Sequence, residues 1–180
     1  DCFVFSDSLL PLEHALEELE KLIEPVVGIG RVRLAEALSH FLAEDVLATR
    51  NVPPHDNSAV DGYAVFHGDL SIFGDTRLPV DGRISAGHPL NTEAKRGYAY
   101  RIFTGAAMPK GTDTVFMQED VRTEKGDVIL PVGIHLGANR RLMGEDVRIG
   151  KVVLNRGKRI RPQELGLAAS IGLCKLMVYK

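Results

Sequence analysis

The chain has only two cysteines among its 180 residues, Cys2 and Cys174, and they stand near opposite ends. Cysteines so far apart form neither a metal-ligand pair nor a disulfide framework, so a reducing cytoplasm is the expected compartment. No run of residues is apolar and long enough to span a membrane, and we expect no signal peptide. The formal net charge of -2 gives no overall attraction to nucleic acid or to an anionic membrane. An anionic ligand therefore needs a local cluster of cations.

Sequence motifs of several large enzyme classes are also missing. The six histidines show neither an HExxH nor an HxxxH pairing, so a zinc hydrolase has little support. The chain lacks the GxSxG motif, the Walker phosphate-binding loop and the Rossmann fingerprint, since Gly28-Ile29-Gly30 has no third glycine. Covalent catalysis by serine or cysteine is not indicated.

What remains is the composition of an ordinary globular protein, with 44% hydrophobic and 26% charged residues. The first fifty residues favour helices. After Pro11, apolar residues recur on one helical face until Glu24-Pro25 ends the helix: Leu12, Leu16, Leu19 and Ile23. An extended piece at 32–34 follows, and AEALSHFLAEDVLA, residues 35–48, again shows a helical stripe.

Residues 53–137 differ, because Pro and Gly recur at intervals too short for helices. Asp81-Gly82 and Lys125-Gly126 predict hairpin-type turns. Beyond Arg140 the pattern is mixed again, with a strand at KVVL and a helix that starts at Pro162 and ends at a left-handed Gly172. The sequence therefore predicts an α+β fold, in which residues 1–50 and 138–180 form an α/β domain and residues 51–137 form an inserted all-β domain.

The stretch NVPPHDNSAVDGYAV, residues 51–65, gathers short oxygen-bearing side chains without a Lys or Arg: Asp56, Asn57, Ser58 and Asp61. A plain Asx turn explains one or two of them and remains the simpler interpretation. The alternative is a site for Mg²⁺ or a hydroxyl-rich ligand, because Mg²⁺ is commonly held by one or two carboxylates. An EF-hand is excluded, because Val60 and His67 fall at its ligand positions.

The stretch RIFTGAAMPKGTDTVFMQED, residues 101–120, places Thr104-Gly105 at the end of a strand. A hydroxyl and a backbone N–H beside glycine can hold a phosphate or a carboxylate, and Arg101 and Lys110 are nearby cations. A plain connection between strands is the alternative.

The stretch ANRRLMGEDVRIGKVVL, residues 138–154, combines two guanidinium groups with two carboxylates around Gly144: Arg140, Arg141, Glu145 and Asp146. Arginine suits bidentate phosphate binding, while the acids can hold a metal on the same ligand. A solvated cluster of surface ion pairs is the alternative.

Taken together and in this order, VPPHDNSAVDGYAV, RIFTGAAMPKGTDTVFMQED and GEDVRIGKVVL…PQELGLAASIG resemble the MoeA family, the molybdopterin molybdotransferases that include the gephyrin E domain. The resemblance runs from the first helix to the last residue. It implies an elongated α/β domain I carrying an inserted domain II of barrel or roll type. It also implies that the first stretch lines the active site.

The resemblance implies a reaction. Family members take adenylylated molybdopterin and molybdate, cleave the pyrophosphate bond with Mg²⁺ present, release AMP and leave molybdenum on the dithiolene. On this basis Asp61, Thr104 and Asp146 are expected to be catalytic. Asp61 positions a metal or a water, Thr104 contacts a phosphate oxygen, and Asp146 serves the metal or molybdate, so Asp61 and Asp146 are the expected Mg²⁺ ligands. The remaining motif residues are expected to bind substrate: Asp56, Asn57, Ser58, Gly105, Arg140, Arg141 and Glu145.

Three departures from the family pattern are local. His55 stands where the family has an aromatic residue, and TGAAMP replaces TGAPLP. Leu142-Met143 occupy places before GED where the family carries more arginine, which weakens the local grip on anions.

The resemblance also predicts an arrangement. The family continues beyond KLMVYK into a pterin-binding domain and a C-terminal β-barrel domain, which this chain lacks. Its active cleft lies between this part of one subunit and the pterin-binding domain of the other. We therefore expect a homodimer in which this chain carries half of a site. A non-catalytic interaction module of the same fold, comparable to the scaffold role of gephyrin, is the alternative.

Overall fold

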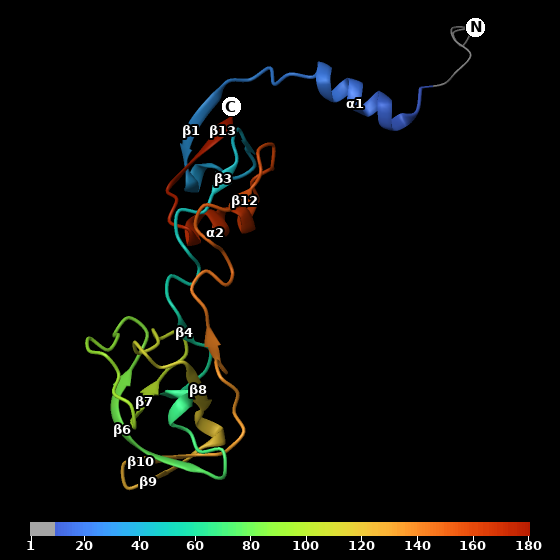
Figure 1. Cartoon of the computed structure of the whole chain (residues 1–180). Helices are drawn as coiled ribbons and strands as arrows, with labels where there is room; N and C mark the ends of the chain where they lie inside the picture. The colour runs from blue at the N-terminus through green and yellow to red at the C-terminus, as the bar shows by residue number, and fades with distance from the viewer. Residues whose placement is uncertain (1–9) are drawn as a thin grey trace, which may run out of the picture.

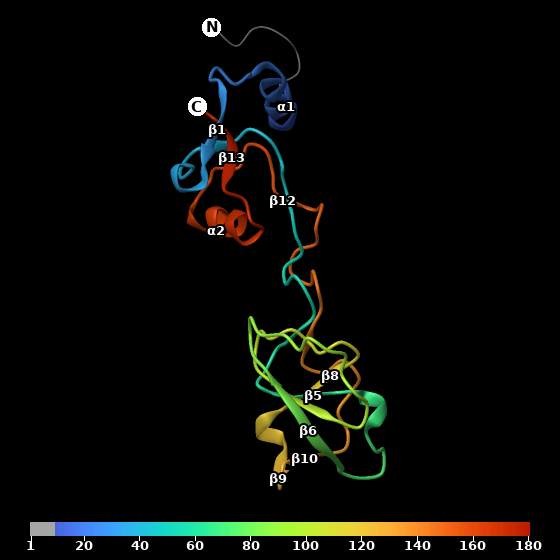
Figure 2. The ribbon, with the colours of Figure 1, turned by 90° about the vertical axis from the view of Figure 1, so that its left-hand side faces the viewer.

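The computed structural model describes residues 10–180, so Cys2 lies outside the described residues. Two lobes follow one another along a long axis, joined by two chain segments that run side by side (Figure 1). A view turned by 90° shows the same separation (Figure 2).

The described residues form mainly β-structure with two α-helices. The elements are α1 (Leu12–Leu22), β1 (Ile29–Arg33), η1 (Leu34–Glu36), β2 (Phe41–Leu42), β3 (Val46–Leu47), β4 (Asn57–Ser58), β5 (Gly62–Val65), η2 (His67–Asp69), β6 (Thr76–Ile84), β7 (Ala99–Ile102), β8 (Thr114–Met117), η3 (Gln118–Asp120), β9 (Arg122–Glu124), β10 (Asp127–Leu130), β11 (Arg140–Arg141), β12 (Val152–Leu154), α2 (Pro162–Ser170) and β13 (Lys175–Tyr179).

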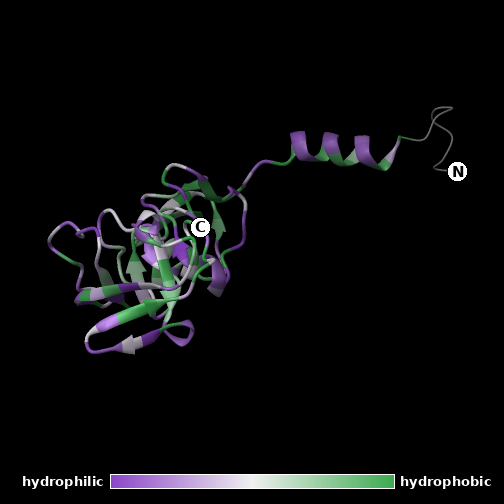
Figure 3. Ribbon diagram, turned by 60° about the horizontal axis from the view of Figure 1, so that its bottom comes forward, coloured by the Kyte–Doolittle hydropathy of each residue, from purple (hydrophilic) through white to green (hydrophobic). Residues whose placement is uncertain are grey.

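The helix predicted after Pro11 is confirmed as α1, but it packs against neither lobe. None of its eleven residues, all of them described, is buried. Leu12, Leu16 and Leu19 are 68%, 55% and 51% exposed. Figure 3 shows the helix projecting from the rest of the molecule, with apolar residues along one side. The predicted contribution of this face to a dimer stays a prediction.

The smaller lobe contains the sheet β1-β13-β2, the pair β12-β3 and helix α2. Its core joins side chains from two distant parts of the chain, with Leu42 and Val46 packed against Ile160, Ile171 and Val178. These two distant parts of the chain therefore share one hydrophobic core, which holds them together in this lobe. The domain boundaries predicted from the sequence stay a prediction.

Helix α2 follows the local signals that predicted it. Pro162 occupies its first position, where the missing N–H removes no helical hydrogen bond. The Glu164 carboxylate accepts a hydrogen bond from the Arg161 backbone N–H at 2.9 Å and caps the first turn. Gly172 follows the helix with φ +86°, the left-handed conformation expected there.

The helix predicted over residues 35–48 is wrong. Only the short 3-10 turn η1 forms there, followed by the strands β2 and β3. Ser39 has φ +69°, which no helix interior tolerates. The backbone pairs with the distant segment around Ile160 instead, since Ser39 N donates to Ile160 O at 2.8 Å and Leu42 N to Lys158 O at 3.0 Å. Tertiary pairing overrides the helical periodicity here.

The larger lobe contains a six-stranded sheet of order β8-β5-β7-β6-β10-β9. Two buried clusters pack against it, one around Tyr100 and Ile102 and one around Phe116 and Val128. The predicted turn at Lys125-Gly126 is confirmed: both residues have positive φ and join β9 to β10.

The hairpin predicted at Asp81-Gly82 is wrong, because both residues lie inside β6. The register shifts between Val80 and Arg83, and Gly82 has φ +107°. β6 pairs antiparallel with β10 before this irregularity and runs parallel to β7 across it. The Asp-Gly pair therefore forms a bulge that redirects a strand.

Within residues 10–180, neither helix is long and apolar enough to cross a membrane.

Candidate active site

The three stretches singled out in the sequence meet at β4, at the end of the larger lobe where the two lobes join (Figure 1). On one side β4 pairs with β11, with Ser58 opposite Arg140 and Asn57 opposite Arg141. On the other side Ser58 N donates to Ala106 O at 3.0 Å, and Gly105 N donates to Ser58 O at 2.9 Å. A two-residue strand thus holds the Thr-Gly turn and the double arginine next to each other.

Asp61 and Thr104 are joined by two hydrogen bonds. Asp61 Oδ1 accepts two hydrogen bonds from Thr104, one from its backbone N–H at 2.8 Å and one from its hydroxyl at 2.7 Å. The backbone bond, the hydroxyl bond and the nearby Arg101 guanidinium together lower the pKa of Asp61. Asp61 is therefore a fixed carboxylate anion at neutral pH.

The Thr-Gly turn uses its own donors within the protein. The Thr104 hydroxyl points its proton at Asp61, and the Gly105 N–H is engaged by Ser58. Gly105 has φ +77°, a conformation that only glycine adopts readily. Contact of Thr104 and Gly105 with a phosphate stays a prediction.

Asp56 connects the first stretch to the third. Its Oδ1 accepts a hydrogen bond from Met143 N at 2.7 Å, and its Oδ2 lies 3.8 Å from Arg140 Nη1. Two buried polar atoms here have no partner within the described residues: Asn57 Oδ1 and Arg140 Nε. Buried polar atoms are nearly always hydrogen-bonded, so these two indicate places where a ligand or a water completes the structure.

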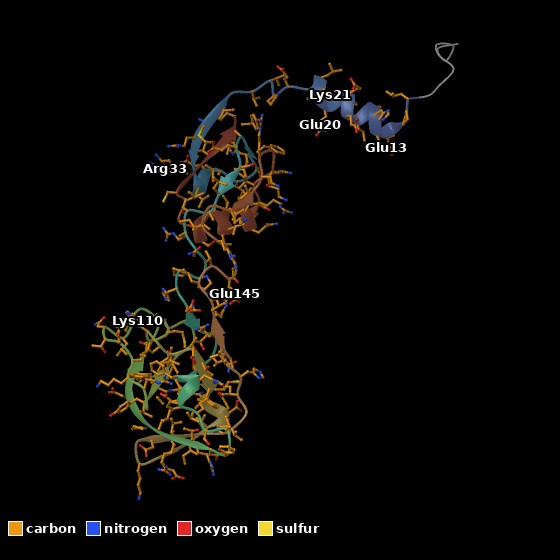
Figure 4. All side chains as sticks on the ribbon, in the orientation of Figure 1. Glu13, Glu20, Lys21, Arg33, Lys110 and Glu145 are labelled. Atoms are coloured by element: carbon orange, nitrogen blue, oxygen red, sulfur yellow. The ribbon has the colours of Figure 1, made fainter. Side chains whose placement is uncertain are left out.

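Arg141 links the start of the loop after β11 to the two acids that follow in that loop. Its Nη2 donates to Asp146 Oδ1 at 2.5 Å and its Nε to Glu145 Oε1 at 3.4 Å. The two acids, Asp146 first, raise the pKa of Arg141 further above its ordinary value. The loop is tied to the first stretch as well, because Gly144 N donates to Pro53 O at 2.9 Å. Figure 4 shows Glu145 in the connection between the lobes, and Lys110 at the near end of the larger lobe.

The two expected metal ligands belong to separate groups, Asp61 with Thr104 and Asp146 with Arg141. No hydrogen bond or ion pair between residues 10 and 180 joins these two groups. The described part of the chain also contains no cluster of three His, Cys, Asp or Glu side chains able to hold a metal ion. Each carboxylate nevertheless keeps one oxygen, Oδ2, to which no described residue donates.

The chain matches the model of the MoeA N-terminal region (domain I and II) over residues 10–172. It belongs to the MoeA family. The resemblance to this family stated from the sequence is thus confirmed.

Known relatives of this MoeA-family chain are longer than it is. The molybdopterin molybdenumtransferase of Haemophilus influenzae is 41% identical over 173 residues, which cover 96% of this chain and 42% of the relative. The protein of the same name from Synechococcus elongatus is 37% identical, covering 85% of this chain and 39% of the relative. The crystal structure of the molybdopterin biosynthesis MoeA protein from Pyrococcus horikoshii OT3 superimposes with a TM-score of 0.82 at 34% identity, covering 96% of this chain and 46% of that one. The chain spans less than half the length of each.

Residues beside this candidate site that the sequence did not predict come from neighbouring strands. Arg101, noted only as a nearby cation, donates from Nη1 to Gly62 O at 3.0 Å and from Nη2 to Gln118 Oε1. Lys110, the other cation, pairs with the exposed Glu93 instead. Gln118 carries no sequence signal, because its proximity to Arg101 depends on the pairing of β5 with β7 and β8.

Proposed function

We propose that this chain is the N-terminal part of a molybdopterin molybdotransferase and carries half of its active site. The whole enzyme takes adenylylated molybdopterin and molybdate, releases AMP and leaves molybdenum on the dithiolene. The observation that carries the proposal is the meeting at β4 of the three motif stretches, which lie far apart in the sequence. The names of the Haemophilus and Synechococcus relatives support molybdopterin as the substrate class.

Asp61 is the proposed centre of this half-site. Thr104 holds its Oδ1 through two hydrogen bonds and keeps the carboxylate ionised, so Oδ2 is presented with a defined charge and position. A fixed anion of this kind orients a water or a cation without reorganising during the reaction. In this proposal Thr104 orients Asp61, and it contacts a phosphate oxygen of the substrate when its hydroxyl proton turns from Asp61 toward that oxygen.

The donor set fits Mg²⁺. Asp61 and Asp146 supply hard carboxylate oxygens, and Mg²⁺ is usually held by one or two carboxylates together with waters and substrate phosphates. When bound, Mg²⁺ neutralises charge on the phosphate oxygens.

Substrate binding is assigned to the atoms that the protein leaves without partners. Arg140 Nε is a buried donor that suits a phosphate or molybdate oxygen, and Asn57 Oδ1 is a buried acceptor that suits a hydroxyl or an amide N–H. Arg141, Glu145 and Asp146, which are joined by ion pairs, are proposed to complete the site.

The arrangement is part of the proposal. An elongated α/β domain I, made from both chain ends, carries the inserted barrel-like domain II, and the pterin-binding domain of the other subunit of a full-length homodimer supplies the missing wall of the cleft. The exposed apolar face of α1 supports contact with another chain. A cytoplasmic location is favoured by the wide separation of the two cysteines.

A chimera tests the proposal. This chain replaces the aligned N-terminal part of the Haemophilus relative, and AMP release and molybdenum transfer are measured with adenylylated molybdopterin, molybdate and Mg²⁺. We expect an active chimera, and an isolated chain that has lost most of the rate, because positioning contributes roughly 7–11 kcal/mol in well-oriented reactions. A chimera that folds and dimerises but releases no AMP contradicts the proposal and favours the interaction module.

A further inference from the structure

A row of side chains crosses four strands of the six-stranded sheet beside the Asp61–Thr104 pair. In register, Phe116 lies opposite Tyr63, Tyr63 opposite Arg101, and Arg101 opposite Arg83. Residues directly opposite one another in adjacent strands project to the same face of a sheet. The row therefore ends on two arginines that stand side by side on β7 and β6.

Phe103 brings these two guanidinium groups to one aromatic ring. The Cζ atom of Arg83 lies 4.7 Å from the ring centroid of Phe103, and that of Arg101 lies 4.5 Å from it. Both distances fall within the range of cation–π attraction. Phe103 directly precedes Thr104, so the paired cations adjoin the candidate active site.

The two arginines differ in what their N–H groups contact. Arg101 is half-buried, contacts Tyr63 as well, and donates to Gly62 O and to Gln118 Oε1. Arg83 is exposed, and its side chain makes no hydrogen bond or ion pair with any residue between 10 and 180. Its guanidinium is thus ordered by stacking while its N–H donors stay available.

Like charges directly opposite each other across two strands destabilise a sheet. The bulge at Asp81-Gly82 is what sets this register, because it places Arg83 opposite Arg101 after the shift. An anion bound at Arg83 removes the repulsion. A phosphate matches the donors well, because the planar fork of arginine binds two phosphate oxygens at once.

We propose that Arg83 is a phosphate-binding residue, stacked on Phe103 and backed by Arg101, which takes a phosphate group of the adenylylated substrate. The identity of that substrate rests on the proposed function. The existence of the phosphate site does not depend on the proposed function, because it rests on the Arg83 guanidinium, which no residue between 10 and 180 engages through a hydrogen bond or ion pair, and on the second cation beside it.

The test measures the binding of two probes, AMP and inorganic pyrophosphate, to the 180-residue chain by NMR titration. We expect Arg83→Gln to weaken the binding of both probes at least tenfold, since a charge-assisted bidentate contact is lost. Arg83→Lys retains the charge but lacks the planar fork, so its affinity for each probe is expected to lie between that of the wild type and that of Arg83→Gln. Arg33→Gln is the matched control, because Arg33 is an exposed arginine on β1 of the other lobe (Figure 4). Adenosine, which lacks the phosphate, is expected not to bind at this site.

Several results overturn the inference: no binding of either probe by the wild-type chain, unchanged binding by a folded Arg83→Gln variant, an equal loss in Arg33→Gln, or adenosine binding as tightly as AMP. The probe-binding test and the chimera test can fail independently of each other. An active chimera with Arg83-independent probe binding removes the Arg83 site alone. An inactive chimera with Arg83-dependent binding removes the molybdotransferase assignment and leaves the phosphate site.

Discussion

Gly62 is the position at which the smallest substitution should disturb the candidate site most. It follows Asp61 directly and lies in β5 between β7 and β8. A Cβ added there would stand 1.7 Å from Phe116 O and 2.8 Å from Phe116 C, both backbone atoms of β8. Backbone cannot rotate away as a flexible side chain does, so β5 and β8 must separate by more than about 1 Å.

The expected cost of Gly62→Ala follows from this clash. Overpacking typically destabilises by about 1–3 kcal/mol, and a clash between two backbones in the middle of a sheet lies at or above the upper end. A loss of about 3 kcal/mol lowers the urea midpoint by roughly 1–3 M for a small domain. Urea unfolding followed by circular dichroism measures the midpoint. Hydrogen exchange localises the effect, with protection expected to fall in β5, β7 and β8 and to stay unchanged in β1 and β13.

Gly166→Ala is the matched control for this substitution. Gly166 lies in α2 with open space where an added Cβ would stand and no positive φ, so alanine is expected to stabilise the chain by about 0.5–1 kcal/mol. A Gly62→Ala variant that unfolds at the wild-type urea concentration, with β5 amides as protected as before, would refute the reasoning.

Two further predictions concern the titration of acids. Thr104→Ala removes the hydroxyl bond but keeps the backbone bond to Asp61, which lowers the pKa of Asp61 the most, so this pKa is expected to rise only part of the way to its ordinary value of 3.8. Carbon-detected NMR titration checks this, and an unmoved pKa contradicts it. For Glu164, bonding to Arg161 lowers the pKa from 4.5 to about 2, so its stabilisation is full above pH 4.5 and disappears as the pH falls toward 2. The stability difference between the wild type and Glu164→Gln should therefore shrink between pH 4.5 and 2, and a difference constant over that window argues against the Glu164–Arg161 bond.

Local sequence signals predicted the structure correctly where the backbone hydrogen bonds join residues that are only a few positions apart. Pro162 and Gly172 mark both ends of α2, and Lys125-Gly126 marks a tight turn, because each depends on residues within a few positions. Residues 35–48 failed for the opposite reason. Their helical periodicity is real, but the partner that decides their conformation lies around Ile160, beyond the reach of any local pattern.

The candidate site divides in the same way. Residue type together with the resemblance to the MoeA family predicted Asp61, Thr104 and Arg141 as candidate site residues, whereas residue type alone left a plain turn or a surface ion-pair cluster as the alternative. Their neighbours were not predictable from residue type. Arg83 meets Arg101 only because β6 shifts register at a bulge that the sequence presents as a hairpin turn. The contacts of Gln118 and Phe103 depend on the same long-range pairing.

Asp61→Asn in the chimera tests the central claim most directly. Asparagine keeps the shape and an oxygen that accepts the two Thr104 bonds, so the fold should be unchanged while the negative charge is lost. Asp75→Asn removes the same charge from the surface of the same lobe, where Asp75 pairs with Arg122. We expect AMP release and molybdenum transfer to fall by roughly a hundredfold or more in Asp61→Asn and to stay near the chimera's own rate in Asp75→Asn. Turnover by Asp61→Asn at the rate of the unmodified chimera would contradict this expectation.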